Sequence, residues 1–154
     1  MFWDRWGAVD YFQGQFTHTL DAKGRLTIPA RFRALLGDRV VVARGAIERC
    51  IDVYPLETWQ QMSKAAQALP HSSPVARRFN RMRFGHSVEV SFDAMGRILI
   101  PGFLREYAEI DGEALIAGAN GMFELWNPAH FAAVTDRDWD EGQATFEETS
   151  RMGV

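Results

Sequence analysis

The chain contains one ten-residue segment twice, and this internal repeat constrains its architecture more than any other feature. Leu20–Pro29 reads LDAKGRLTIP, and Phe92–Pro101, which begins 72 positions later, reads FDAMGRILIP. Six of the ten positions are identical without a gap, and Arg33 matches Arg105 downstream. A unit of about 45 residues built from short strands buries too little apolar surface to be stable alone. Two such units can pair about a pseudo-twofold axis, so the sequence predicts one domain with internal twofold symmetry.

Each copy predicts the same order of short strands and helices. Apolar residues alternate towards Leu20 and again towards Phe92, which is typical of a half-buried strand. The Asp-Ala-X-Gly segment predicts a turn, because Asp can bond its own downstream backbone and Gly accepts a positive φ. A second short strand follows, and a proline then begins a helix. A hairpin completes each copy, and Asn120-Gly121 is a strong turn signal in the second one.

A helical segment joins the two copies. One helix is expected over 55–69, and another begins at Pro74. Val75, Phe79 and Met82 recur at i, i+4 and i+7 on the second helix, and we expect this stripe to face a core. The expected division of the chain is an N-terminal extension (1–13), copy one (14–59), a helical linker (60–84), copy two (85–131) and an acidic C-terminal tail (132–154).

Charge is sorted along the chain, whose net charge is −3. Residues 21–110 hold fourteen Lys and Arg against nine Asp and Glu, whereas residues 111–154 hold two against nine. This distribution indicates a basic working surface and a separate acidic tail. An ordinary solvated surface with an acidic end would give the same counts. Residues 136–154 are also poor in periodic apolar positions, so we expect at least their final stretch to be mobile.

Composition argues against several classes of protein. The one cysteine, Cys50, cannot form an intramolecular disulfide and fits a reducing cytoplasm. No apolar run approaches the ~20 residues of a membrane helix, and the first residues lack the pattern of a signal peptide. The four histidines show no metal-ligand spacing with one another or with Cys50. We also find no nucleophile context or phosphate-binding loop, so we predict no enzyme activity, cofactor or metal.

The first repeated turn is the candidate functional site. Asp21 and Arg25 flank a turn that contains Lys23 and Gly24. A carboxylate four positions away can hold a guanidinium and fix its direction, and Gly lets the backbone approach a phosphate. Arginine suits phosphate or a guanine edge, because its planar fork satisfies two acceptors at once. The alternative is that Asp and Arg merely close the turn.

The second turn is more apolar than the first. Asp93 and Arg97 occupy the equivalent positions, but a methionine replaces the lysine and a phenylalanine replaces Arg31. We therefore expect copy one to carry the main surface for contact with phosphate or a guanine edge, which Arg31 and Arg33 extend. In copy two we expect Arg97 to make a secondary contact with the same ligand.

The repeated motifs resemble those of a known family. Thr19–Arg33 is similar to the opening signature of MraZ proteins, and Asp93–Pro101 is similar to their second copy. Tyr54–Trp59 and Ala76–Phe79 are also similar to the family pattern, so the resemblance covers about residues 14–131. It implies a mainly β fold with short helices (α+β), namely an AbrB-like swapped-hairpin, double-split barrel built from both copies.

The resemblance also implies a function. Such a protein is a transcription regulator that binds double-stranded DNA at direct repeats upstream of the division and cell-wall gene cluster, usually including its own gene. It would act as a ring-shaped homo-oligomer in the cytoplasm, associated with the nucleoid. The extra residues 1–11 and the acidic stretch 136–148 depart from the family pattern. The alternatives are an antitoxin-like protein of the same fold group, whose members usually carry one copy, and a ring-forming structural protein with no DNA role.

Overall fold

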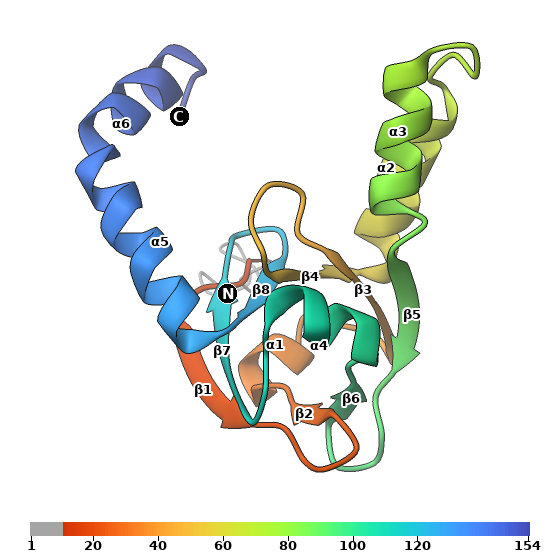
Figure 1. Ribbon diagram of the computed structural model, residues 1–154, viewed down its shortest axis with the longest axis vertical. Helices are drawn as coiled ribbons and strands as arrows, with labels where there is room; N and C mark the ends of the chain where they lie inside the picture. Colours follow the sequence, from red (N-terminus) through yellow and green to blue (C-terminus); the bar gives the residue numbers. More distant parts are fainter. Residues whose placement is uncertain (1–10) are drawn as a thin grey trace, which may run out of the picture.

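The computed structural model describes residues 11–154, so most of the expected N-terminal extension lies outside the described residues (Figure 1). Copy one together with the helical linker consists of β1 (Gln15–Thr19), β2 (Arg25–Thr27), α1 (Ala30–Arg33), β3 (Arg39–Arg44), β4 (Ile51–Pro55), α2 (Leu56–Gln67) and α3 (Pro74–Arg83). Copy two together with the acidic tail has the same order: β5 (Ser87–Ser91), β6 (Arg97–Leu99), α4 (Gly102–Ala108), β7 (Glu113–Gly118), β8 (Phe123–Trp126), α5 (Pro128–Asp140) and α6 (Gly142–Arg151). The expected combination of β-sheet with short helices is confirmed.

Six strands form one antiparallel sheet in the order β1-β7-β8-β4-β3-β5, and β2 pairs with β6 in a separate two-stranded ribbon. Both outer strands, β1 and β5, pair with a strand of the other copy. Leu26 pairs with Ile98 in the ribbon, and Asp52 pairs with Glu124 in the sheet. The members of each pair are 72 positions apart, which is the repeat offset. The pseudo-twofold axis therefore passes through both pairs.

The swapped-hairpin, double-split barrel that the resemblance implies is not confirmed, and no closed barrel is found in residues 11–154. Strands β1 and β5 are the two edges of the sheet and do not pair with each other. Each edge strand instead leads through a turn into the ribbon, which packs across one face of the sheet. The sheet thus stays open, and the ribbon covers the core.

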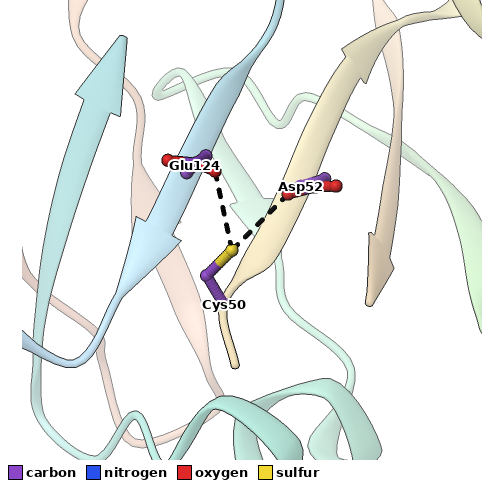
Figure 2. A group of neighbouring side chains, drawn as sticks. All are labelled: Cys50, Asp52 and Glu124. Carbon is purple, nitrogen blue, oxygen red and sulfur yellow. Dashed lines mark hydrogen bonds between the residues drawn. The ribbon is translucent and has the colours of Figure 1, made fainter. Parts of the chain in front are cut away.

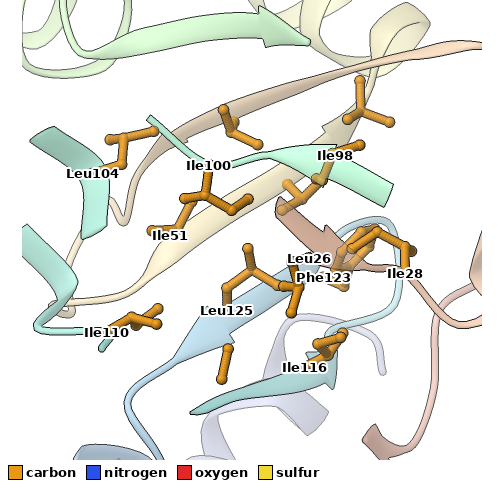
Figure 3. Packing of buried hydrophobic residues seen from close by; sticks show 14 of the residues in the cluster. Leu26, Ile28, Ile51, Ile98, Ile100, Leu104, Ile110, Ile116, Phe123 and Leu125 are labelled. Atoms are coloured by element: carbon orange, nitrogen blue, oxygen red, sulfur yellow. The ribbon is translucent and has the colours of Figure 1, made fainter. Parts of the chain in front are cut away.

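The hydrophobic core lies between the sheet and the ribbon (Figure 3). Leu26 and Ile98 from the ribbon and Leu125 from the sheet are fully buried. Phe12 also belongs to this core, with 3% of its surface exposed and its ring 5.2 Å from that of Phe32. Phe12 lies within the expected N-terminal extension (1–13), and its side chain packs in this core.

Helix α3 buries a different face from the one expected. Val75, Phe79 and Met82 are 69%, 41% and 54% exposed, so the prediction that they face a core is wrong for the single chain. The buried positions are Ala76 and Arg83, which lie one residue further along the helix. Arg83 lies on this buried face, and its guanidinium reaches a carboxylate in the sheet.

The acidic C-terminal segment is helical and forms α5 and α6. Helix α5 begins after Asn127, whose side-chain oxygen accepts the backbone N–H groups of Ala129 and His130. Neither α5 nor α6 contains a buried residue. We call α2 and α3 the basic arm, and α5 and α6 the acidic arm. Both arms project from the side of the sheet opposite the ribbon (Figure 1).

None of the helices in the described part of the chain has both the length and the apolar character needed to cross a bilayer.

Candidate nucleic-acid interface

The Asp21 carboxylate closes the turn that leads into β2. One of its oxygens accepts the backbone N–H groups of Lys23 and Arg25, at 3.0 and 2.9 Å. The other oxygen accepts Nε–H of Arg25 at 2.5 Å. The backbone and side-chain bonds from Arg25, together with the backbone bond from Lys23, lower the pKa of Asp21. The carboxylate therefore remains charged at neutral pH and fixes the direction of the guanidinium.

Copy two builds the same turn before β6. One oxygen of Asp93 accepts the backbone N–H groups of Met95 and Arg97, at 2.9 and 3.0 Å. The other accepts Nε–H of Arg97 at 2.8 Å, and these bonds lower the pKa of Asp93 as well. The pairing of carboxylate and guanidinium expected from the sequence is thus present in both copies.

The ribbon brings the two turns side by side. The backbone N–H of Ile100 donates to the carbonyl of Gly24 at 2.9 Å, and the backbone N–H of Ile28 donates to the carbonyl of Gly96 at 3.1 Å. Nη1 of Arg97 consequently lies 3.6 Å from the Asp21 carboxylate, so Asp21 contacts both guanidinium groups. The Arg25 side chain is 35% exposed and that of Arg97 is 22% exposed. Arg25 is therefore the more accessible of the two.

Arginines 33 and 105 each reach the turn of the other copy. Nη1 of Arg33 lies 3.5 Å from the carbonyl of Met95, and a Cβ atom on Gly96 would overlap this guanidinium. A Cβ atom on Gly24 would lie 2.9 Å from the guanidinium carbon of Arg105. An arginine thus occupies the space beside each glycine.

Arg105 was missed as a site residue, although its match to Arg33 across the repeat was the signal that could have found it. Its Nε–H donates to the carbonyl of Ile100 at 3.0 Å, which fixes the side chain beside the first turn. Arg31 is exposed on α1 and forms no hydrogen bond with either turn in the described chain. Lys23 is exposed at the tip of its turn.

A second polar cluster includes Asp52 and Glu124, which alternate along β4 and β8 with the core residues Ile51 and Leu125 and so lie on the opposite face of the sheet. Figure 2 shows its three side chains. Cys50 precedes β4, and its sulfur lies 3.5 Å from Oδ1 of Asp52 and 3.8 Å from Oε2 of Glu124. Cys50 and Asp52 are 1% and 5% exposed. Burial raises the pKa of all three side chains. These are the described residues that could hold a metal ion.

Two guanidinium interactions of Arg83 complete this second cluster. Nη1 lies 3.2 Å from Oδ2 of Asp52, and Nη2 donates to the hydroxyl of Tyr54 at 2.8 Å. On the other side, the indole N–H of Trp126 donates to Oε1 of Glu124 at 3.1 Å. Spacing in the sequence could not reveal this cluster, because strand pairing brings Glu124 beside Asp52 from the other copy.

Comparison with known proteins gives one consistent result. The family model described as "MraZ protein, putative antitoxin-like" matches residues 11–82 and again residues 83–152. The second match includes both helices of the acidic arm, so the arm is the counterpart of the basic arm.

Curated relatives carry the same family name. A protein of Desulfitobacterium hafniense named "Transcriptional regulator MraZ" is 38% identical over 143 residues, which is 93% of this chain and 99% of the relative. Relatives of the same name from Thermomicrobium roseum and Roseiflexus castenholzii are 45% and 44% identical. Those alignments cover 79% and 80% of this chain and 85% of each relative. The chain, with its two tandem matches, belongs to the MraZ family.

Proposed function

We propose that this chain is a sequence-specific transcription regulator that contacts double-stranded DNA through the β2–β6 ribbon. The observation that carries this proposal is the pair of adjacent turns, in each of which a carboxylate holds an arginine by Nε. Within the described residues, that geometry leaves the terminal nitrogens of Arg25 available for hydrogen bonds to DNA. The names of the curated relatives support the regulatory role.

The shape of the ribbon also suits DNA. A two-stranded ribbon fits the major groove of B-DNA, and arginine is the commonest reader of guanine there. Lys23 and Arg31 add exposed cations on the copy-one side, where they can contact phosphates. Asp21 and Asp93 then act by positioning the arginines, and Gly24 by making room for Arg105. Arg33 supports the second turn and contributes positive charge.

A DNA titration tests this proposal. The wild-type chain should bind DNA from upstream of its own gene more tightly than a scrambled sequence of equal length. A double Arg25→Ala, Arg97→Ala variant should lose this preference while its circular dichroism spectrum is unchanged. Equal affinity of the wild type and the double variant for upstream DNA would refute the site.

We further propose that the targets are direct repeats upstream of the division and cell-wall gene cluster, including the gene for this chain. Footprinting upstream of that gene should show protection at regularly spaced repeats. One protomer offers only a small basic ribbon, so oligomerisation is needed to engage several repeats together. Linked sites can raise avidity by about 10²–10⁴.

The two arms support a ring of identical chains. The basic arm exposes Phe79 between Arg78 and Arg81, whereas the acidic arm has a pocket lined in part by Trp139 and Phe146. The other residues lining this pocket are Asp138, Glu141, Gly142 and Thr145. An apolar, basic helix of one protomer can thus dock on an apolar, acidic surface of the next. Such a head-to-tail contact closes into a ring when the rotation allows it.

Light scattering tests the assembly. The wild type should form one discrete oligomer at micromolar concentration, and Phe79→Glu should shift it towards the monomer without unfolding. A stable wild-type monomer would contradict the ring.

An antitoxin role is the second candidate, and the family description favours retaining it. In that case the acidic arm would bind a toxin, which co-expression with an adjacent gene product would reveal.

A further inference from the structure

We propose that Cys50, Asp52 and Glu124 form a binding site for a divalent transition-metal ion of the zinc type. This site is separate from the proposed DNA ribbon. It lies on the face of the sheet between the arms, at the point where the pseudo-twofold axis crosses strands β4 and β8.

The spacing of the three ligand atoms fits tetrahedral coordination. A zinc ion bound at ordinary Zn–S and Zn–O distances holds sulfur and oxygen about 3.5–3.7 Å apart. The sulfur of Cys50 lies 3.5 Å from Oδ1 of Asp52 and 3.8 Å from Oε2 of Glu124. The ligand atoms all lie within 4.8 Å of one another (Figure 2). Small side-chain movements would therefore be enough to coordinate an ion.

The outer oxygens of both carboxylates are already held by other groups. Arg83 binds Oδ2 of Asp52, and Trp126 donates to Oε1 of Glu124, which leaves one oxygen of each carboxylate directed at the sulfur. Metal sites in proteins typically have such outer hydrogen bonds, which orient the ligands. The arrangement thus shows both the ligands and their supporting contacts.

The thiol of Cys50 cannot donate to both carboxylates that face it, although the backbone of Ala46 also bonds Asp52. The thiol of Cys50 has one proton, but two carboxylate oxygens face its sulfur. One of these oxygens must therefore take up a proton, or lie in a buried site without a donor from the thiol. Asp52 is 5% exposed, so water can hardly replace the missing hydrogen bond to its carboxylate.

Charge balance also favours a divalent ion. Two carboxylates and a thiolate carry three negative charges, which Arg83 and one divalent cation neutralise together. Binding would release the thiol proton of Cys50 as the metal–sulfur bond forms. A thiolate ligand favours zinc-type ions over magnesium or calcium, which prefer oxygen. Glu124 is half-buried, so the ion can enter from its side.

Cobalt(II) titration of the chelator-treated full chain tests the site, because a cobalt–thiolate bond absorbs in the near ultraviolet. The expected result is a charge-transfer band that saturates at one ion per chain and is displaced by zinc. Cys50→Ser should abolish the band. Trp126→Phe removes the outer donor to Glu124 and keeps an aromatic ring in the buried cluster, so it should weaken binding about tenfold or more.

Further variants keep the test decisive. Glu124→Gln should weaken cobalt binding, whereas Glu113→Gln, which changes an exposed carboxylate on β7, should leave it unchanged. Circular dichroism confirms that each variant is folded. Absence of the band in the wild type, its persistence in Cys50→Ser, or equal weakening by both glutamate variants would overturn the proposal.

Discussion

The two copies share one backbone plan and differ in the charges placed on it. Both build the same turn, with a carboxylate that holds an arginine by Nε. Copy one adds exposed Lys23 and Arg31 around its turn, where copy two has Met95 and Phe103. The repeat therefore specifies the ribbon, whereas the substitutions within it determine which half presents positive charge.

The arms differ in the same way. Each ends its second helix on an arginine, Arg83 in the basic arm and Arg151 in the acidic arm. Arg83 is 5% exposed and pairs with buried Asp52, whereas Arg151 pairs with Glu148 at the surface. The last helical residues of the two arms thus have different roles, because only Arg83 reaches a carboxylate of the sheet.

The largest expected effect is on the free energy of unfolding, and it differs between these two arginines. Arg83→Met should lower the free energy of unfolding by about 3–5 kcal/mol, because it leaves a buried carboxylate without its cation. Arg151→Met is the matched control and should change it by less than about 0.5 kcal/mol, since exposed pairs contribute little. Urea unfolding at one protein concentration measures both. Equal losses would show that the arms are not energetically different.

The second prediction compares the two turns in DNA binding. Arg25→Ala should cost about 1–3 kcal/mol of affinity per engaged protomer if Arg25 reads a base. Arg97→Ala should cost less, because Arg97 is less exposed and lies near two carboxylates. Asp21→Ala should fall between them, since it frees Arg25 without removing its charge. Titration of upstream DNA gives the order, with Arg151→Ala as a control far from the ribbon.

A different order would identify the role of these residues. If Asp21 and Arg25 only close the turn, both alanine variants should lower the melting temperature alike and leave the affinity of the folded protein intact. If Arg97→Ala costs as much as Arg25→Ala, both copies read DNA equally.

Much of this fold was predictable from local sequence. The repeat predicted the paired turns, and Asn120-Gly121 predicted the β7–β8 hairpin, in which Asn120 has a φ of +68°. The start of α3 was also predictable, because Ser73 caps it and Pro74 follows. These features depend on residues close together in the chain, whose preferences are readable without the tertiary structure.

The remaining features depend on long-range contacts. The stripe of Val75, Phe79 and Met82 has helical periodicity, but the pair between Arg83 and Asp52 turns a different face towards the sheet. The expected double-split barrel is not confirmed, and strand pairing leaves both edges of the sheet open. No spacing rule could bring Glu124 beside Cys50.

The third prediction concerns the carboxylate pair at the pseudo-twofold axis, measured with chelator present. Burial raises the pKa of Glu124 above its ordinary value of 4.5, so the folded state binds a proton more readily than the unfolded state. Protonated Glu124 therefore stabilises the folded state below pH 4.5, and this contribution is lost as pH rises through the pKa of Glu124 in the folded state. Glu124→Gln should remove this pH dependence and raise stability at pH 8 relative to the wild type.

Asp52→Asn is the comparison for that experiment. It removes the partner of buried Arg83, so it should lower stability at pH 8 although the pKa of Asp52 is also raised by burial. Unfolding free energies at several pH values from 5 to 8 give both results. If both variants change the free energy of unfolding in the same direction at pH 8, Asp52 and Glu124 have the same effect on stability, and the difference proposed between them is wrong.

The smallest expected effect concerns the end of the acidic arm. Deletion of residues 145–154 should leave the melting temperature of the dilute protein within about 2 °C of the wild type, because α6 contains no buried residue. The arm should remain attached through α5, where Phe131 and Val134 pack near Trp126 and Arg137 pairs with Glu48 at 2.6 Å. Differential scanning calorimetry measures the shift in melting temperature. Light scattering at micromolar concentration should show a weakened oligomer, because the deletion removes Phe146 from the pocket proposed to receive the neighbouring arm. A large fall in melting temperature would mean that α6 stabilises the fold as α3 does, and the two arms would then differ in charge alone.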